Sequence, residues 1–123
     1  MSNKEMAKSF LQMVAAGDVK TAYDKFVAAN FIHHNPYFKG DRQSLMEAME
    51  EASKKNPNRL LDIKHIFEDG NTIITHSHVI KENSNGINIS VIHIMHFQNE
   101  RMVEMWEIGQ PILKISPNEN GVF

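Results

Sequence analysis

The chain has 123 residues, a formal net charge of −2 and no cysteine. Its length suits a domain with a real hydrophobic core, and 41% hydrophobic against 23% charged residues separates it from disordered chains. The lack of a basic run argues against a nucleic-acid partner, and the lack of cysteine excludes disulfides, thiol nucleophiles and iron–sulfur ligation.

No targeting or membrane segment stands out in the sequence. No run approaches the roughly 18 apolar residues that a membrane-spanning helix needs, and residues 1–18 lack the apolar stretch of a secretory signal. We therefore expect a cytoplasmic protein with no membrane partner. We expect one domain, 1–123, with its folded core at about 4–112 and a loose tail at 116–123.

Apolar residues recur at helical spacing in the first half of the chain. The predicted helices are 2–16, 19–29 and 42–55. Gly17 suits the left-handed residue that ends the first helix, while Asp18 and Asp41 are placed to cap the N-termini of the next two. Between the second and third helices, Phe31 to Phe38 predict a short extended piece that is stopped by Asn35-Pro36.

From Arg59 onward the apolar pattern changes to a period of two residues, which is typical of strands. The predicted strands are 59–68, 71–81, 87–97 and 102–110, with turns at Asp69-Gly70 and Gln98–Arg101 and a loop at 83–86. Three helices followed by four antiparallel strands, with one short strand between helices, predict the α+β class.

The strand predicted at 87–97 is apolar on both faces. Ile92 and Ile94 lie on one face, and Val91, Met95 and Phe97 lie on the other. A strand of this kind is covered on both faces. Since three helices can cover only one face of a curved sheet, we expect a second copy of the chain to cover the outer face, and therefore a homodimer.

The histidines are grouped in the predicted strands. His33 and His34 are neighbours in an extended piece, so they point in opposite directions and one of them can face the core. His76 and His78 are two residues apart and share a strand face. Each of these side chains is either a candidate for proton transfer or a hydrogen-bonded structural residue.

A metal site is a lesser alternative. His76 and His78 form a His-x-His pair, and together with His93 and Glu107 they would suit zinc or iron. Such pairs are common by chance, and the chain contains no His-Glu-x-x-His motif. We predict neither a metal ion nor another cofactor.

The use of the last two strands as a site depends on the length of the turn between them. With a two-residue turn at Asn99-Glu100, His93 lies opposite Trp106, and Glu107 falls on the other face. With a three-residue bulged loop, His93 lies opposite Met105 and shares a face with Glu107. The residue pattern leaves both registers open.

The chain resembles the SnoaL-like branch of the nuclear transport factor two-like superfamily, which includes predicted aldol-condensation and ester-cyclase proteins. The segments that carry the resemblance are, in order, FIHHNP, THSHVIK, VIHIMHF and VEMWEIGQPI. The resemblance spans about Lys4 to Ile112. It implies a cone-shaped α+β fold in which three N-terminal helices pack on a strongly bent antiparallel sheet and enclose a pocket.

The resemblance also implies which residues face that pocket. By position it points to His34, to the pair His76 and His78, and to His93 and Glu107. It favours the bulged register, in which the last two residues share a pocket.

Two departures from related proteins bear on this interpretation. The family's Asn-Gly turn is Asn99-Glu100 here. The ketosteroid isomerases of the same superfamily use an Asp base with a Tyr and a protonated Asp, where this chain has Asn35, His93 and Phe10. We therefore predict no isomerase of that mechanism.

The resemblance implies a small, mostly apolar carbonyl ligand and acid–base catalysis of an aldol cyclisation, isomerisation or lyase step. The residues assigned to catalysis are His34, His78, His93 and Glu107. The residues assigned to ligand contact are Phe10, Met13, Tyr23, Asn35, His76, Met95 and Met105. Burial would raise the pKa of Glu107 and make it an acid, whereas a hydrogen bond to a histidine would make it hold the imidazole's tautomer. The alternative is a non-catalytic module of the same fold that binds a small ligand or a partner.

Overall fold

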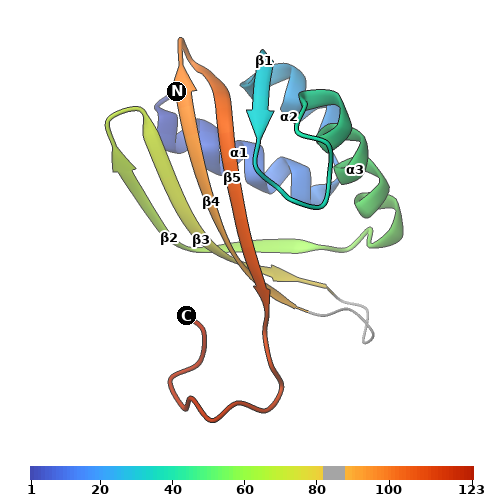
Figure 1. Cartoon of the computed structure of the whole chain (residues 1–123), viewed down its shortest axis with the longest axis vertical. Coiled ribbons are helices and arrows are strands. Elements are labelled where there is room, and N and C mark those ends of the chain that lie inside the picture. Colours follow the sequence, from blue (N-terminus) through green and yellow to red (C-terminus); the bar gives the residue numbers. More distant parts are fainter. Residues whose placement is uncertain (82–87) are drawn as a thin grey trace.

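The structure is a computed structural model that describes residues 1–81 and 88–123. Within them the chain forms three helices and five strands (Figure 1). The helices are α1 (Asn3–Ala16), α2 (Val19–Phe26) and α3 (Arg42–Lys55), and the strands are β1 (Val27–His33), β2 (Leu60–Asp69), β3 (Thr72–Ile80), β4 (Ile89–Gln98) and β5 (Arg101–Pro111). The predicted α+β class is confirmed. The loop predicted at 83–86 lies outside the described residues.

The ends of the helices follow from their capping residues. Gly17 ends α1 with a φ of 100°, a left-handed backbone conformation that is unfavourable for residues with a side chain. Asp41 caps α3, because its Oδ2 accepts a hydrogen bond of 3.0 Å from the backbone N–H of Ser44. Asp18 stands at the N-cap of α2, but its side chain makes no capping hydrogen bond in the described part of the chain. No helix of the described residues is long and apolar enough to cross a membrane.

Strand β1 is the main difference from the predicted elements. The helix expected to reach Ala29 ends at Phe26, and Val27 is already extended. After the helix the buried side chains are Val27, Phe31 and His33, all odd-numbered, as in a strand. β1 pairs in parallel with β5, so the hydrogen bonds available at the edge of β5 outweigh the helix propensity of the alanines. The sheet is therefore mixed rather than purely antiparallel.

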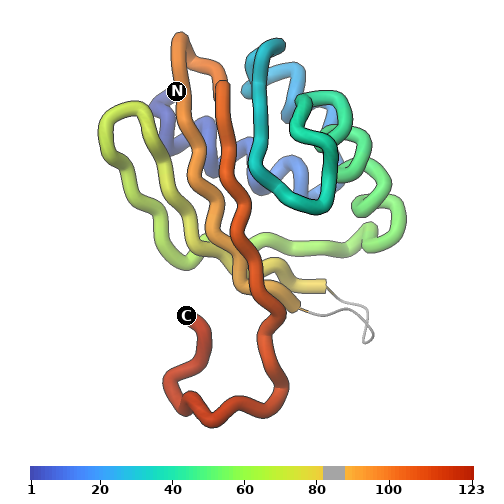
Figure 2. Tube along the Cα trace, viewed as in Figure 1, coloured from blue at the N-terminus to red at the C-terminus, as the bar shows by residue number. Residues whose placement is uncertain are grey.

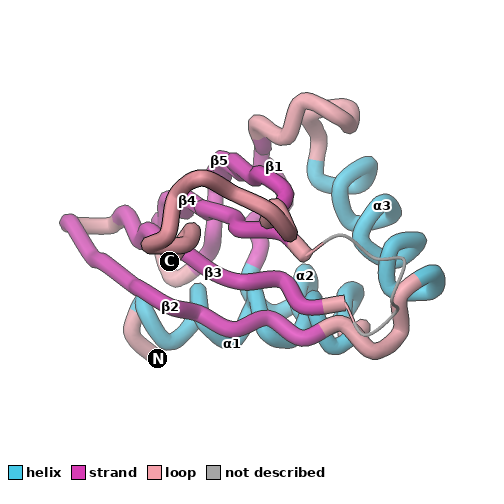
Figure 3. Tube along the Cα trace, turned by 90° about the horizontal axis from the view of Figure 1, so that it is seen from below, coloured by secondary structure: helices cyan, strands magenta, loops and turns pink. Residues whose placement is uncertain are grey.

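The five strands lie in the order β1-β5-β4-β3-β2. Figures 1 and 2 show that β2 and β3 change direction along their length, so the sheet is strongly curved. Helices α1 and α2 lie on one side of the sheet, and residues 112–123 run on the opposite side (Figure 3). Three helices against a strongly bent sheet are the arrangement that the cone-shaped fold requires.

The sheet has an inner face toward the helices and an outer face away from them. On β4 the buried inner side chains are Val91, His93, Met95 and Phe97, and the half-buried outer ones are Ile92, Ile94 and His96. Most of the inner apolar side chains belong to one cluster with residues of α1, α2 and α3. The hydrophobic core therefore fills the space between the helices and the inner face.

The β4–β5 hairpin combines features of both predicted registers. Its turn has two residues, Asn99 and Glu100, with φ values of 51° and 62°, as in a type I′ turn. The pairing then shifts, because Val103 is an extra residue in β5. His93 consequently lies opposite Glu107, and neither Trp106 nor Met105 is its partner. The expected shared face is confirmed, but the exact pairing differs from both alternatives.

Candidate functional site

A cavity of about 640 Å³ opens between the ends of β4 and β5, the segment after β1, and α3. This volume lies in the range of small-molecule sites. Among the residues that line it are Asn35, Tyr37, Met49, Arg59, His93 and Glu107. Polar and titratable groups from separate elements therefore meet beside apolar side chains.

His93 and Glu107 form the centre of this site. They are directly opposite each other on adjacent strands, and His93 Nε2 lies 3.7 Å from Glu107 Oε1. The side chain of His93 is 8% exposed and that of Glu107 is 25% exposed. A separation of 3.7 Å is an ion-pair distance, longer than a direct hydrogen bond. Nδ1 of His93 is buried without a partner among the described residues.

Asn35 joins the segment after β1 to this pair. Its Nδ2 donates a hydrogen bond of 3.0 Å to Glu107 Oε2, and its Oδ1 accepts one of 3.0 Å from the backbone N–H of Tyr37. Its backbone N–H donates to Nδ1 of His33 at 3.1 Å. The Asn-Pro break that the sequence indicates thus forms a turn that holds an amide donor against the carboxylate.

His33, rather than His34, faces inward. The residue is 5% exposed. Its Nδ1 accepts a hydrogen bond from the backbone N–H of Asn35, so Nε2 carries the ring hydrogen. Nε2 donates that hydrogen to the carbonyl oxygen of Lys39 at 2.7 Å. Both ring nitrogens are therefore engaged, and His33 acts as a structural clamp on the segment 33–39. The alternating directions of two neighbouring histidines predicted that one would face inward, but not which.

Burial raises the pKa of Glu107, but the nearby imidazole of His93, the amide of Asn35 and the neighbouring His33 lower it by more. The net pKa lies below the usual value for a glutamate. The expectation that burial would turn Glu107 into an acid is therefore wrong. Glu107 is ionised at neutral pH, which suits the alternative role of holding an imidazole.

A second, much smaller cavity of about 30 Å³ adjoins the same pair on its core side. Phe10, Tyr23 and Met105 line it together with His93 and Glu107. Burial and the charge of Glu107 raise the pKa of Tyr23 well above its usual value, although Arg42 opposes this. Tyr23 is therefore a neutral phenol near the Glu107 carboxylate. Three of the predicted ligand-contact residues thus lie close to the pair, separated from the larger cavity.

His34 lies at the rim of the large cavity, but its ring turns to the outer face of the sheet. The ring stacks on Trp106 with centroids 4.8 Å apart and an angle of 7° between the planes. Its Nε2 is 2.7 Å from Glu104 Oε2. The expected position of Trp106 on the face opposite to Glu107 is confirmed, and His34 packs with it.

The structure does not bring His76 and His78 to the cavity. They share a face, as predicted, but it is the outer face, because the buried residues of β3 are the alternate ones, Ile73, Thr75 and Ser77. The ring of Phe123 lies 5.0 Å from the ring of His76 and 5.2 Å from that of His78. The pattern of the strand fixes which residues share a face but not which face turns inward.

The remaining predicted contacts, Met13 and Met95, belong to the core. Met95 is fully buried and Met13 packs against the same apolar cluster. Several lining residues were not predicted from the sequence, among them Tyr37, Met49 and Arg59, and the sequence marks Arg59 only as the start of a strand. No group of three or more His, Asp or Glu side chains in residues 1–81 and 88–123 is arranged to hold a metal ion.

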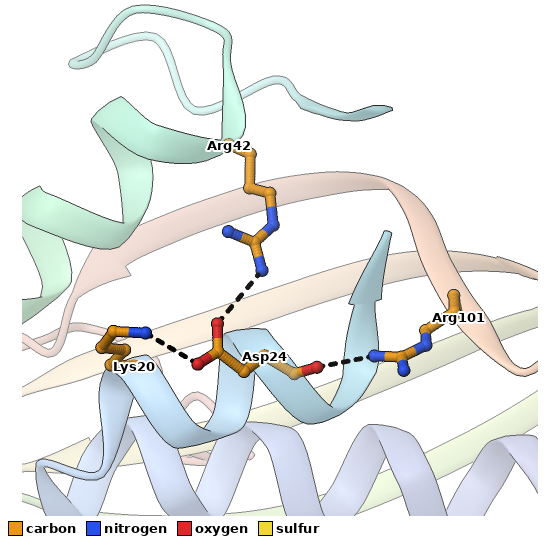
Figure 4. A network of polar contacts seen from close by, with 4 residues as sticks. All are labelled: Lys20, Asp24, Arg42 and Arg101. Carbon is orange, nitrogen blue, oxygen red and sulfur yellow. Dashed lines mark hydrogen bonds and ion pairs between the residues drawn. The ribbon is translucent and has the colours of Figure 1, made fainter. Parts of the chain in front are cut away.

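A larger depression, of about 1160 Å³, lies over β1 and the start of α3. Figure 4 shows Lys20, Arg42 and Arg101 converging on Asp24 beside it. Lys20 Nζ and Arg42 Nη2 lie 2.8 and 3.8 Å from the Asp24 carboxylate, and Arg101 Nη1 donates to the Asp24 carbonyl oxygen at 2.7 Å. The Asp24 carboxylate is thus already paired. Asp41 Oδ1 and Arg42 Nε at this depression are buried without a partner among the described residues, but no described histidine lines it, so the smaller cavity with its histidine–carboxylate pair is the better candidate site.

Solved structures with the same fold come from several bacteria. An NTF2-like protein of unknown function from Cytophaga hutchinsonii is 15% identical, with a TM-score of 0.72 over 89% of this chain and 91% of that one. A candidate polyketide cyclase from Acidithiobacillus ferrooxidans is 21% identical, with a TM-score of 0.73 over 89% and 92%. IdmH from Streptomyces antibioticus, also described as a candidate polyketide cyclase, is 12% identical, with a TM-score of 0.74 over 89% and 93%.

At these identities the solved structures show the fold and leave the activity open. No protein with a curated description matches the chain in sequence. The sequence profile of the SnoaL-like domain, by contrast, matches residues 7–105, which include Asn35, Arg59 and His93 of the cavity wall but end before Glu107. The chain therefore belongs to the SnoaL-like domain family, within the NTF2-like fold.

Proposed function

We propose that the protein binds a small, mostly apolar carbonyl compound in the 640 Å³ cavity and catalyses a proton-transfer reaction of it, of the cyclisation, isomerisation or lyase type. The observation that carries this proposal is the His93–Glu107 pair, which sits at the wall of the cavity with a separation of 3.7 Å. Two structural neighbours described as candidate polyketide cyclases are consistent with carbonyl chemistry.

In this proposal His93 is the base. Glu107 is ionised and faces Nε2, so Nε2 carries the hydrogen and Nδ1 carries the lone pair. Nδ1 takes a proton from the carbon next to the ligand's carbonyl group, and the C–H electron pair forms a C=C bond as the carbonyl becomes an enolate. Glu107 stabilises the imidazolium that results. The proton returns to the ligand at a later step. His34, whose Nε2 pairs with Glu104, and His78, whose ring packs against Phe123 on the outer face, are left out.

The alternative function is non-catalytic binding of a small ligand. It is favoured by one observation, the 8% exposure of His93, because a base that a ligand cannot reach does not transfer protons. The two functions differ in a measurable way, since only a catalyst exchanges the ligand's protons with solvent.

The experiment is proton exchange of small ketones in D₂O, followed by ¹H NMR. The wild-type protein should accelerate loss of the α-proton signal of at least one ketone in a saturable manner. His93→Gln should lower this rate by about 10²–10⁴-fold, the usual contribution of a general base. His96→Gln is the matched control, because His96 lies on the outer face and bonds to Thr72. Exchange that survives in His93→Gln, or is absent from the wild type for every ketone, would overturn the catalytic proposal.

We also propose that two copies associate through the outer face of the sheet. Among its apolar side chains are Ile32, Phe67 and Ile108, which are 48%, 59% and 57% exposed, with Ile94 and Trp106 half-buried between them. Exposed apolar side chains on one face of a sheet favour association.

Sedimentation velocity tests the dimer. The wild-type protein should sediment as a dimer at micromolar concentration, and Ile108→Asp should shift it to the monomer. Gln12→Asp, at an exposed position of α1 on the helix side of the sheet, is the control and should leave the dimer intact. A monomeric wild-type protein, or an Ile108→Asp variant that stays dimeric, would count against this interface.

A further inference from the structure

The most distinctive unexplained group in the cavity is the guanidinium of Arg59. Arg59 directly precedes β2, after the Pro57 break that ends the α3 region, and it lines the cavity with His93 and Glu107. Nothing in the proposed proton transfer uses it.

Two of its nitrogen atoms are buried and unpaired. Nε and Nη2 of Arg59 have almost no exposed surface and no hydrogen-bond partner among the described residues. These two atoms form one edge of the guanidinium plane, the edge that pairs side-on with both oxygens of a carboxylate. Burial also lowers the pKa of Arg59, opposed by the charge of Glu107, which agrees with a desolvated cation.

Three charged residues line the cavity, Arg59, Lys81 and Glu107, and no ion pair joins any two of them within the described part of the chain. Glu107 interacts with His93 and Asn35, and Arg59 forms no ion pair within the described residues. A buried cation without an anion is costly, and an anionic ligand group would relieve that cost. A planar monoanion fits this edge better than a phosphate, whose second charge would be repelled by Glu107.

We propose that Arg59 is a carboxylate-binding residue and that the cavity takes small oxo acids, with the carboxylate on the Nε–Nη2 edge and the carbonyl beside His93. This inference rests on the proposed function, because it names the substrate class of that same site. It makes Arg59 the determinant of specificity, separate from the groups that move the proton.

Paired test compounds separate the charge from the rest of the ligand. The affinities of 4-oxopentanoate and its methyl ester are measured by NMR titration, and longer oxo acids are compared with their esters in the same way. The wild-type protein should bind at least one acid about tenfold more tightly than its ester, as expected of a charge-assisted bidentate pair. Arg59→Gln should abolish this preference, and Arg59→Lys should keep only a small part of it, because an ammonium is a point charge.

Two controls make the result specific. Arg101→Gln removes an exposed arginine at the other depression and should leave the preference unchanged. Arg59→Gln should also unfold at no lower urea concentration than the wild type, since it removes an unpaired buried charge. A loss of stability in that variant would make Arg59 a structural residue and overturn the inference.

The remaining outcomes distinguish this inference from the proposed function. Equal binding of acid and ester by the wild type would overturn the carboxylate site, while ketone exchange that depends on His93 would leave the proposed function standing. A full preference in Arg59→Lys would overturn the side-on geometry. If neither compound bound and no ketone exchanged, the proposed function would fail and the oxo-acid inference with it.

Discussion

The hydrogen bond between Asn35 and Glu107 allows a sharp test of the site's electrostatics. Asn35 Nδ2 lies 3.0 Å from Glu107 Oε2. The substitution Asn35→Asp replaces that donor by a carboxylate oxygen of nearly the same size. It retains the acceptor that holds the backbone N–H of Tyr37, so the turn is preserved. The change therefore acts mainly on charge.

Two carboxylates at 3.0 Å repel by about 5.5 kcal/mol at an effective dielectric constant of 20. The protein avoids part of this cost by protonating one of them. For an acid with an ordinary pKa of about 4.3, protonation at pH 7 costs about 3.7 kcal/mol. Because this is the cheaper route, Asn35→Asp should lower the free energy of unfolding at pH 7 by about 3–4 kcal/mol.

The dependence on pH has a definite sign. The pKa of Glu107 is lower in the folded protein than in the unfolded chain. The ionised Glu107 side chain therefore contributes its full stabilisation at pH values above its pKa in the unfolded chain. This stabilisation is lost as the pH falls through its pKa in the folded protein. In Asn35→Asp, by contrast, the proton that one of the two facing carboxylates takes up costs less free energy at low pH. The deficit of the variant should therefore shrink to about 1 kcal/mol near pH 4.5.

Urea denaturation followed by the fluorescence of Trp106, the one tryptophan in the chain, measures both quantities. Asn30→Asp is the matched control, because Asn30 is exposed on β1 and should change stability by less than about 0.5 kcal/mol. If Asn35→Asp unfolds like Asn30→Asp at pH 7, or its deficit is the same at both pH values, the hydrogen bond does not govern the Glu107 carboxylate.

Two further predictions concern backbone conformation, and urea denaturation measures both. Gly17→Ala should destabilise the protein by about 1–2 kcal/mol, because the φ of 100° is unfavourable for alanine and its Cβ would lie 2.9 Å from Ser53 Oγ. An unchanged midpoint would show that the end of α1 adapts freely. Glu100→Gly should stabilise it by about 1 kcal/mol, since the φ of 62° suits glycine. A lower midpoint would mean that the Glu100 side chain makes a stabilising contact.

The helices and the antiparallel strands follow from local patterns in the sequence, but β1 does not. Ala28, Ala29 and Asn30 carry no strand signal, and the segment is extended because it pairs with the edge of β5, which lies far along the chain. The same limit applies to His76 and His78. Both faces of β3 carry a mixture of polar and apolar residues, so the local pattern does not reveal which face meets the helices.

The candidate site was predictable only in part, for a similar reason. His93 and Glu107 were predicted to share the inner face of the sheet, and they lie opposite each other there. The Asn35-Pro36 break in the sequence marks the turn from which the Asn35 amide donates to the Glu107 carboxylate. The buried edge of Arg59 depends on how α3 and the sheet close around it. Such burial is a tertiary property, and an isolated arginine at the start of a strand gives no sign of it.

The bulge at Val103 has a consequence for how the hairpin responds to a change in its length. Phe97 pairs with Met102 and His96 pairs with Glu104, so Val103 between them has no partner residue on β4. Deleting it would leave His93 facing Glu107, whereas one residue inserted between Glu104 and Glu107 would exchange the faces of the strand. The hairpin should therefore tolerate the loss of one residue beside its turn while the Glu107 carboxylate and the imidazole stay together.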